Sequence, residues 1–287
     1  MNPALNSTDA HNASEEEQVR SSSNPAFRNL PSGQGGYATF DRQGGALGGT
    51  AAYADSAAGD IDYTKRAGTG ERPITIDDVV TKTAITGGVA LVAGVLTALS
   101  GLGPVLVLPA FIVGLVVSLI VIFKQSSNPG LVLTYSAAMG IALGAITQVF
   151  DAIYPGIAAQ AIIGTAGVFV GMLVVYKTGA VRVTPRFTKW LMGAMVGVVV
   201  LMIANLVAGL FGANLGLRDG SWLSIVFSLV VIGVAAFSLL LDFDQADQAI
   251  RAGAPAKFAW YIAFGLMTTL VWLYIEILRL LSYLRQD

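Results

Sequence analysis

The sequence contains no cysteine, and its only histidine is His11. These shortages exclude disulfide bonds, thiolate catalysis and cysteine-type zinc sites from the whole chain, and Ser–His–Asp catalysis from its long apolar part. Charged residues are scarce as well: they make up 12% of the 287 residues, whereas an average soluble domain has about 25%. Since 54% of the residues are hydrophobic, the composition indicates an integral membrane protein rather than a soluble enzyme.

The charges that are present fall unevenly along the chain. Residues 1–78 hold 6 Lys and Arg against 11 Asp and Glu, whereas residues 79–287 hold 11 against 7 and nearly all the long apolar runs. Residues 1–72 are rich in Ser, Gly, Asn and Ala and show no helical or strand period. Such a segment cannot bury enough apolar surface to offset its ordering entropy. We therefore predict a disordered, cytoplasmic N-terminal tail over residues 1–72.

The remaining chain is built from apolar stretches of the length that a bilayer crossing requires, which is about 20 residues. Gly- and Pro-rich breakers separate them, and Thr75 or Asp77 is placed to cap the first helix. We predict an all-α integral membrane protein with a seven-helix domain over residues 73–287. The predicted spans are residues 79–100, 104–123, 130–150, 157–176, 190–211, 222–242 and 260–284.

Basic residues lie on alternate sides of these spans. They flank the first span and fill the connections that follow the second, fourth and sixth spans, whereas the opposite connections contain almost only Arg218. By the positive-inside rule the N-terminus is expected in the cytoplasm and, after seven crossings, the C-terminus outside. Three glycine pairs have the spacing that lets membrane helices approach closely, and we expect them to pack within the bundle: Gly140/Gly144, Gly167/Gly171 and Gly193/Gly197.

Two acidic residues interrupt the apolar spans. Asp242 ends the sixth span, and Glu276 lies within the seventh. A charge at the centre of a bilayer costs roughly 2.5–3.5 kcal/mol, so such residues usually face a cavity or a partner. If the two carboxyls meet, they share a proton and titrate as a coupled pair, which would make a proton-operated latch.

The residues alone also allow two arrangements in which Asp242 and Glu276 do not meet. Arg279 lies three residues after Glu276 and could neutralise it along one helix face, and Asp242 could face cytoplasmic water. Depth matters too: if the seventh helix enters the membrane at Lys257, Glu276 lies about 28 Å along it, too far out to meet Asp242. The pair therefore requires residues 256–264 to form a cytoplasmic extension.

These residues resemble the Bax-inhibitor-type family, also called the transmembrane BAX inhibitor motif or YccA-like family. Leu-Asp-Phe-Asp-Gln at residues 241–245 is similar to its aspartate-bearing motif, and Leu-Tyr-Ile-Glu-Ile-Leu-Arg-Leu-Leu at residues 273–281 is similar to its final helix. The resemblance covers about residues 72–287 of this chain. Three further segments, residues 23–31, 75–83 and 176–179, most resemble actinobacterial members.

The resemblance implies a seven-helix bundle whose last helix is central and wrapped by the other six. It also implies a buried dicarboxylate that senses pH and controls a calcium leak across the membrane. Carried over to this sequence, the pair is Asp242 and Glu276, with Glu where the family more usually has Asp. Lys124 is the nearest match to a basic residue that engages the family's dicarboxylate, and Arg279 and Asp244 are further candidate charge partners.

We therefore expect a pH-sensitive calcium leak channel, a multi-pass protein of a bacterial plasma (inner) membrane. Calcium prefers six to eight oxygen ligands, so Asp242 and Glu276 would hold it weakly and transiently, as a transported ion rather than a cofactor. The alternative is a regulator that transports nothing and modulates a membrane protease or another partner, as some bacterial relatives do, with Phe27 and the tail as a handle.

Enzymes and nucleic-acid binding proteins are disfavoured. The near-neutral net charge of -1 gives no sign of a nucleic-acid partner. An intramembrane aspartyl protease would need the GxGD motif of that group, which is absent, and a retinal protein would need a lysine in the last span, where residues 258–284 contain none. The expected partners are therefore the lipid bilayer and a transported cation, and no cofactor is expected.

Overall fold

The computed structural model describes residues 71–212 and 215–286. Most of the predicted tail, including His11 and Phe27, lies outside these residues. In the described part, seven helices are long and apolar enough to cross a membrane, so the predicted class and number of spans are confirmed. They are α2 (Ile76–Ser100), α3 (Gly103–Lys124), α4 (Pro129–Ile153), α5 (Ile157–Thr178), α6 (Pro185–Leu210), α7 (Trp222–Arg251) and α8 (Ala259–Leu284), the last preceded by the short 3₁₀ helix η2 (Ala256–Phe258).

The helix ends follow the predicted breakers, although α7 extends well beyond its predicted span. Thr75 caps α2 in a capping box with Asp78, which confirms one of the two predicted caps. Asn128 caps α4, whose first residue is Pro129. Helix α7 continues to Arg251, just before the predicted breaker at residues 253–255, although its apolar run ends at residue 242. Hydropathy marks the end of the apolar run, and the polar turns that follow it remain helical.

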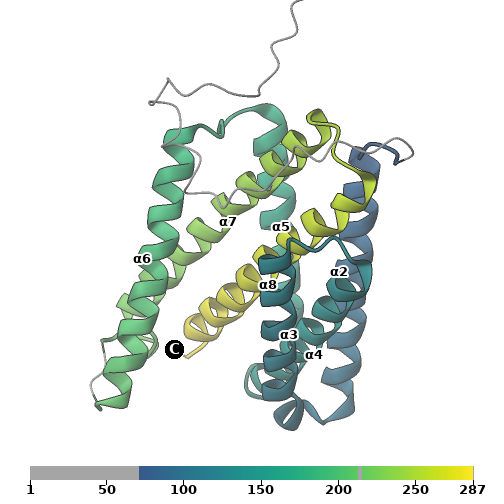
Figure 1. Ribbon diagram of the computed structural model, residues 1–287. Helices are drawn as coiled ribbons and strands as arrows, with labels where there is room; N and C mark the ends of the chain where they lie inside the picture. Colours follow the sequence, from purple (N-terminus) through teal and green to yellow (C-terminus); the bar gives the residue numbers. More distant parts are fainter. Residues whose placement is uncertain (1–70, 213–214, 287) are drawn as a thin grey trace, which may run out of the picture. The chain divides into compact units, whose positions relative to one another are not determined.

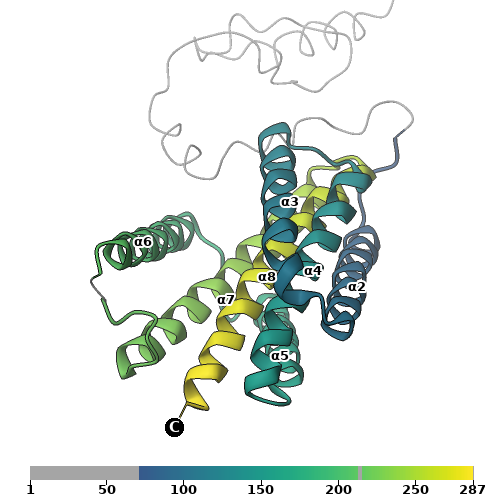
Figure 2. The ribbon, with the colours of Figure 1, turned by 90° about the horizontal axis from the view of Figure 1, so that it is seen from below.

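Helix α8 lies at the centre of the bundle. It packs on α2, α4, α5 and α7, and Figure 1 shows it crossing between α7 and the pair of α3 and α4. Leu273 and Leu278 are almost completely buried along it. The central position of the last helix is thus as expected, but the other six do not share the contact equally: α3 packs mainly on α4, and α6 packs on α7 at the edge of the bundle (Figure 2).

Glycines allow α2 and α4 to touch through their backbones. A Cβ added at Gly140 would overlap the backbone of Ala90, and one added at Gly144 would overlap the backbone of Gly94. This predicted pair therefore packs within the bundle, as expected. The other two pairs do not work in this way, since an added Cβ would meet nothing within 4 Å at any of their members, Gly167, Gly171, Gly193 and Gly197.

This contact predicts a stability difference between two equivalent substitutions. Gly140→Ala should lower the free energy of unfolding by about 1–3 kcal/mol, because overpacking a close backbone contact forces the helices apart. Gly167→Ala, in open space, should be neutral or slightly stabilising, because alanine is the better helix former. The measurement is the apparent melting temperature in detergent. Equal shifts for the two variants would contradict the packing.

The start of the described chain is tied to the connection between α7 and α8. Backbone hydrogen bonds of 2.8 and 2.9 Å join residues 72–74 to residues 254–256. Ile74 is buried in the same place, at 3% exposure, and Lys257 Nζ lies 2.6 Å from Glu71 Oε1. Residues 71 and 72, which the sequence assigned to the tail, therefore contact the membrane domain.

Candidate functional site

Asp242 lies on α7 and faces α8. Its Oδ2 accepts a hydrogen bond of 2.6 Å from Thr269 Oγ1, and its Oδ1 faces Gly265, where an added Cβ would lie 3.9 Å away. The Asp242 side chain is half-buried. Among the described residues, no Lys or Arg forms an ion pair with it. Within the described chain, Asp242 thus has a hydroxyl partner and no counter-ion.

Glu276 has the opposite surroundings. It lies on α8 about 10 Å beyond Thr269 along the helix axis and is 2% exposed. Its Oε1 accepts hydrogen bonds from Arg279 Nη1 at 2.6 Å and Arg218 Nη2 at 3.2 Å. Its Oε2 is buried and has no hydrogen-bond partner among the described residues. Two guanidinium groups therefore compensate this one carboxylate.

The structure does not bring Asp242 and Glu276 together, which corrects the predicted pairing. The pair required residues 256–264 to extend from the bundle into the cytoplasm. In the structure Ala259 and Ile262 are buried in the core, and α8 meets Asp242 at Thr269, seven residues before Glu276. Thr269 then lies at the level of Asp242, and Glu276 lies farther toward the other end of α8. Of the arrangements left open by the sequence, the neutralising contact with Arg279 is the one that forms.

The two remaining predicted charge partners lie elsewhere. Lys124 ends α3 with an exposed side chain, and in the described part of the chain no ion pair joins it to either carboxyl. Asp244 faces α5 rather than α8, because its oxygens accept hydrogen bonds from Gln248 Nε2 at 2.6 Å and from the Tyr176 hydroxyl at 3.4 Å. Neither residue takes part in an Asp242 site.

Arg218, like Thr269, is a site residue that the sequence did not identify as a partner. It lies in the connection between α6 and α7, next to Asp219. Hydrogen bonds from Ser221 and Ser224 lower the pKa of the Asp219 carboxyl to about 2, so this acid stays charged and helps to hold the connection in place. Burial and the nearby charge of Arg279 lower the pKa of Arg218. The only signal in the sequence was an isolated basic residue in an otherwise almost uncharged connection.

The oxygen donors at Asp242 are too few for a tight metal site. Among the described residues there is no group of three or more His, Cys, Asp or Glu that could hold a metal ion. The Asp242 carboxylate and the Thr269 hydroxyl supply only part of the six to eight oxygens that calcium prefers. Contact with a cation at this point would be weak and transient, as conduction requires.

Comparison with known proteins gives the same family that residues 241–245 and 273–281 resemble. A family model described as Bax inhibitor 1 like matches residues 2–286. The match extends over nearly the whole chain and includes α7 and α8, which carry Asp242 and Glu276. Among curated proteins, none matches the sequence.

Proposed function

The chain belongs to the Bax inhibitor 1 like family, and from this premise we propose that it is a pH-sensitive calcium leak channel with Asp242 as its titratable element. One observation carries the proposal: a carboxyl on a membrane-spanning helix has a hydroxyl partner and no counter-ion among the described residues. A group of this kind is expensive to hold in a membrane and usually marks an ion or proton pathway.

The protonation state of Asp242 decides what it can do. As a carboxylate it leaves one oxygen, Oδ1, toward Gly265, where that oxygen can contact a passing cation while Thr269 holds the other. As a carboxylic acid it is neutral and offers a cation no charge, so the attraction is lost. The leak should therefore increase as the pH rises.

Glu276 has a structural part in this proposal. With Arg218 and Arg279 it forms a cluster of two positive charges and one negative charge, which does not attract calcium. The cluster joins α8 to the connection between α6 and α7. These ion pairs stabilise the packing of that connection against α8. The transported cation is thus assigned to Asp242 alone, which revises the site expected from the sequence.

The proposal differs from the alternative, a regulator of a membrane protease, in its use of the tail. The test is calcium entry into liposomes that contain either the full chain or a chain lacking residues 1–70, which keeps the docked residues 71–75. We expect both proteins to leak calcium at similar rates, well above protein-free liposomes. Leakage from neither, together with capture of a membrane protease by the full chain only, would favour the regulator. The proposed role is not catalytic in either case.

Membrane orientation can be tested separately. We propose a bacterial plasma membrane with the N-terminus in the cytoplasm, because Lys82, Lys124, Arg251 and Lys257 all lie near one end of the bundle. A reporter fused after Asp287 should be active only outside the cell. Activity in the cytoplasm would mean that the proposed orientation is reversed.

A further inference from the structure

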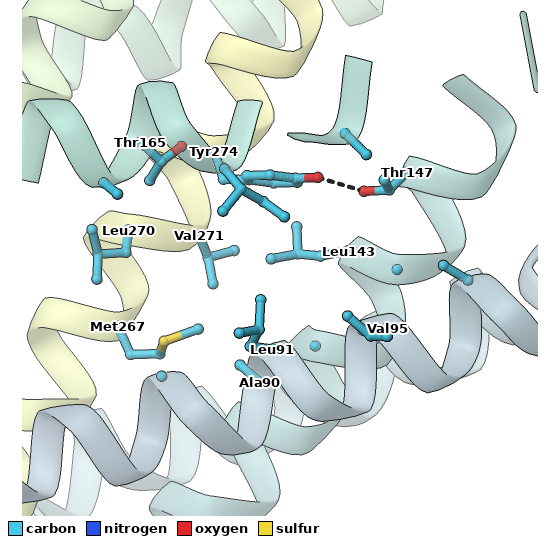
Figure 3. A pocket seen from close by; sticks show the side chains of 18 of the residues that line it. Ala90, Leu91, Val95, Leu143, Thr147, Thr165, Met267, Leu270, Val271 and Tyr274 are labelled. Carbon is cyan, nitrogen blue, oxygen red and sulfur yellow. Dashed lines mark hydrogen bonds between the residues drawn. The ribbon is translucent and has the colours of Figure 1, made fainter. Parts of the chain in front are cut away.

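An apolar cavity of about 460 Å³ lies between α2, α4, α5 and α8. Figure 3 shows aliphatic side chains from three of these helices turned toward it, among them Leu91 of α2, Leu143 of α4 and Leu270 of α8. None of the described residues that line it is charged. The cavity is separate from both acidic residues of the site, since neither Asp242 nor Glu276 lines it.

The few hydroxyl groups in the lining are already hydrogen-bonded within the protein. The Tyr274 hydroxyl bonds to Thr147 Oγ1 at 2.7 Å (Figure 3), and Thr165 Oγ1 donates to the carbonyl of Ala161 at 2.8 Å. A buried water needs about two to four polar partners, whereas an apolar cavity of about 150 Å³ stays dry and binds benzene. This larger cavity therefore suits a larger apolar ligand.

The cavity is continuous with the surface that faces lipid. Leu91, Val95 and Leu99 of α2 line it and are 53%, 47% and 80% exposed. In a membrane-spanning helix this exposure is contact with acyl chains. The lining extends from Gly87, near the middle of α2, to Leu99 and to Ala158 in the first turn of α5. The cavity thus runs from the middle of α2 to the bundle end that carries the α2–α3 and α4–α5 connections.

We propose that this cavity binds one acyl chain of a bilayer phospholipid, drawn from the leaflet at that end of the bundle. The continuity with the lipid-facing surface provides the entrance. The apolar lining surrounds the acyl chain. Because no described lining residue is charged, the headgroup stays at the membrane interface. The same absence disfavours a free fatty acid held inside the cavity, because its carboxylate would lack a partner there.

The test uses a phosphatidylcholine with a diazirine on one acyl chain, in liposomes that contain the full-length protein. After illumination, peptide mass spectrometry locates the labelled residues. Gly87→Leu fills the cavity, since an added Cβ at Gly87 meets nothing within 4 Å. Gly88→Leu is the matched control on the same helix, equally open but outside the lining. We expect Gly87→Leu to reduce labelling of the cavity residues about tenfold, and Gly88→Leu to leave it unchanged.

A second filling variant, Ala166→Leu on α5, should give the same loss, and melting temperatures measured for all three variants show which of them are folded. Labelling spread evenly over the lipid-facing helices, including α3 and α6, and insensitive to both filling variants would mean ordinary boundary lipid and would overturn the proposal. The proposal would also be overturned if a free diazirine fatty acid labelled the cavity residues and the labelled phospholipid did not. The outcome is independent of calcium flux, so this proposal and the proposed channel function can fail separately.

Discussion

Asp242→Asn is expected to abolish the pH dependence of the calcium leak and to hold it at the low rate that the wild type shows in acid. Asparagine has nearly the shape of the protonated acid and cannot acquire a charge, so the variant stays in the state that attracts no cation. At pH 8 the rate should fall about tenfold or more, the change expected if one uncompensated charge contributes about 1.4 kcal/mol to the passing ion. The measurement is calcium entry into liposomes between about pH 5 and pH 8.

Asp244→Asn is the matched control for this experiment. Asp244 lies two residues farther along α7, but it faces α5 and accepts hydrogen bonds from Gln248 and Tyr176. Its replacement should leave the pH profile of the leak unchanged. A wild-type profile in Asp242→Asn, or an equal flattening in both variants, would remove the reason for assigning the titration to Asp242.

Glu276→Gln is expected to destabilise the protein and to leave the pH dependence of the leak intact. Removing one partner of a buried ion pair typically costs about 3–5 kcal/mol, because the other charge is left uncompensated. Here two guanidinium groups would remain near each other, but their side chains are 25% and 24% exposed, so water reduces the cost. We expect a loss of roughly 2–3 kcal/mol in the free energy of unfolding.

Thermal or denaturant unfolding in detergent measures this loss, and Arg285→Gln provides a control. Arg285 hydrogen-bonds to the carbonyl of Pro155 and to Gln160 at the surface, so its replacement should change stability by only about 0.5 kcal/mol or less. A double-mutant cycle between Glu276 and Arg218 should show a coupling of at least about 1 kcal/mol. Full stability of Glu276→Gln together with a flat pH profile would instead identify Glu276 as the sensor.

The spans could be predicted because hydropathy and helix length answer the same physical requirement. A segment that crosses a bilayer must be apolar over about 20 residues and must satisfy its backbone internally. This argument placed all seven helices, and the capping preference of Thr and Asp gave two candidate caps for the first, of which Thr75 is the one that forms. It did not place the end of α7, because the polar turns up to Arg251 are helical for reasons that hydropathy does not record.

The sequence was enough to identify the two acidic residues as site candidates, but not to predict whether they lie together. Asp242 and Glu276 stand out because each interrupts an apolar run, whereas their separation depends on the level at which α7 and α8 meet. The rise of 1.5 Å per residue placed Glu276 too far along its helix if that helix enters the membrane at Lys257, and in the structure Asp242 contacts Thr269 instead. Arg218 could not be found in this way, because a connection between helices has no period from which its position can be derived.

The glycine pairs could also be identified from the sequence, but their contacts could not. All three have the spacing that presents a flat face on a helix, and the spacing does not say whether a neighbour lies against that face. Only Gly140 and Gly144 meet another backbone at close range, that of α2. The other pairs have open space beside them because α5 and α6 lie on the outside of the bundle there.

The central claim is that Asp242 is the pH-sensing carboxyl, whereas Glu276 is ion-paired with Arg218 and Arg279. Infrared difference spectroscopy tests this most directly, because a carboxylic acid has a carbonyl band that its carboxylate lacks. On acidification the wild type should gain a band that Asp242→Asn loses and Glu276→Gln retains. Loss of that band in both variants, as a proton shared between the two residues requires, would contradict the account.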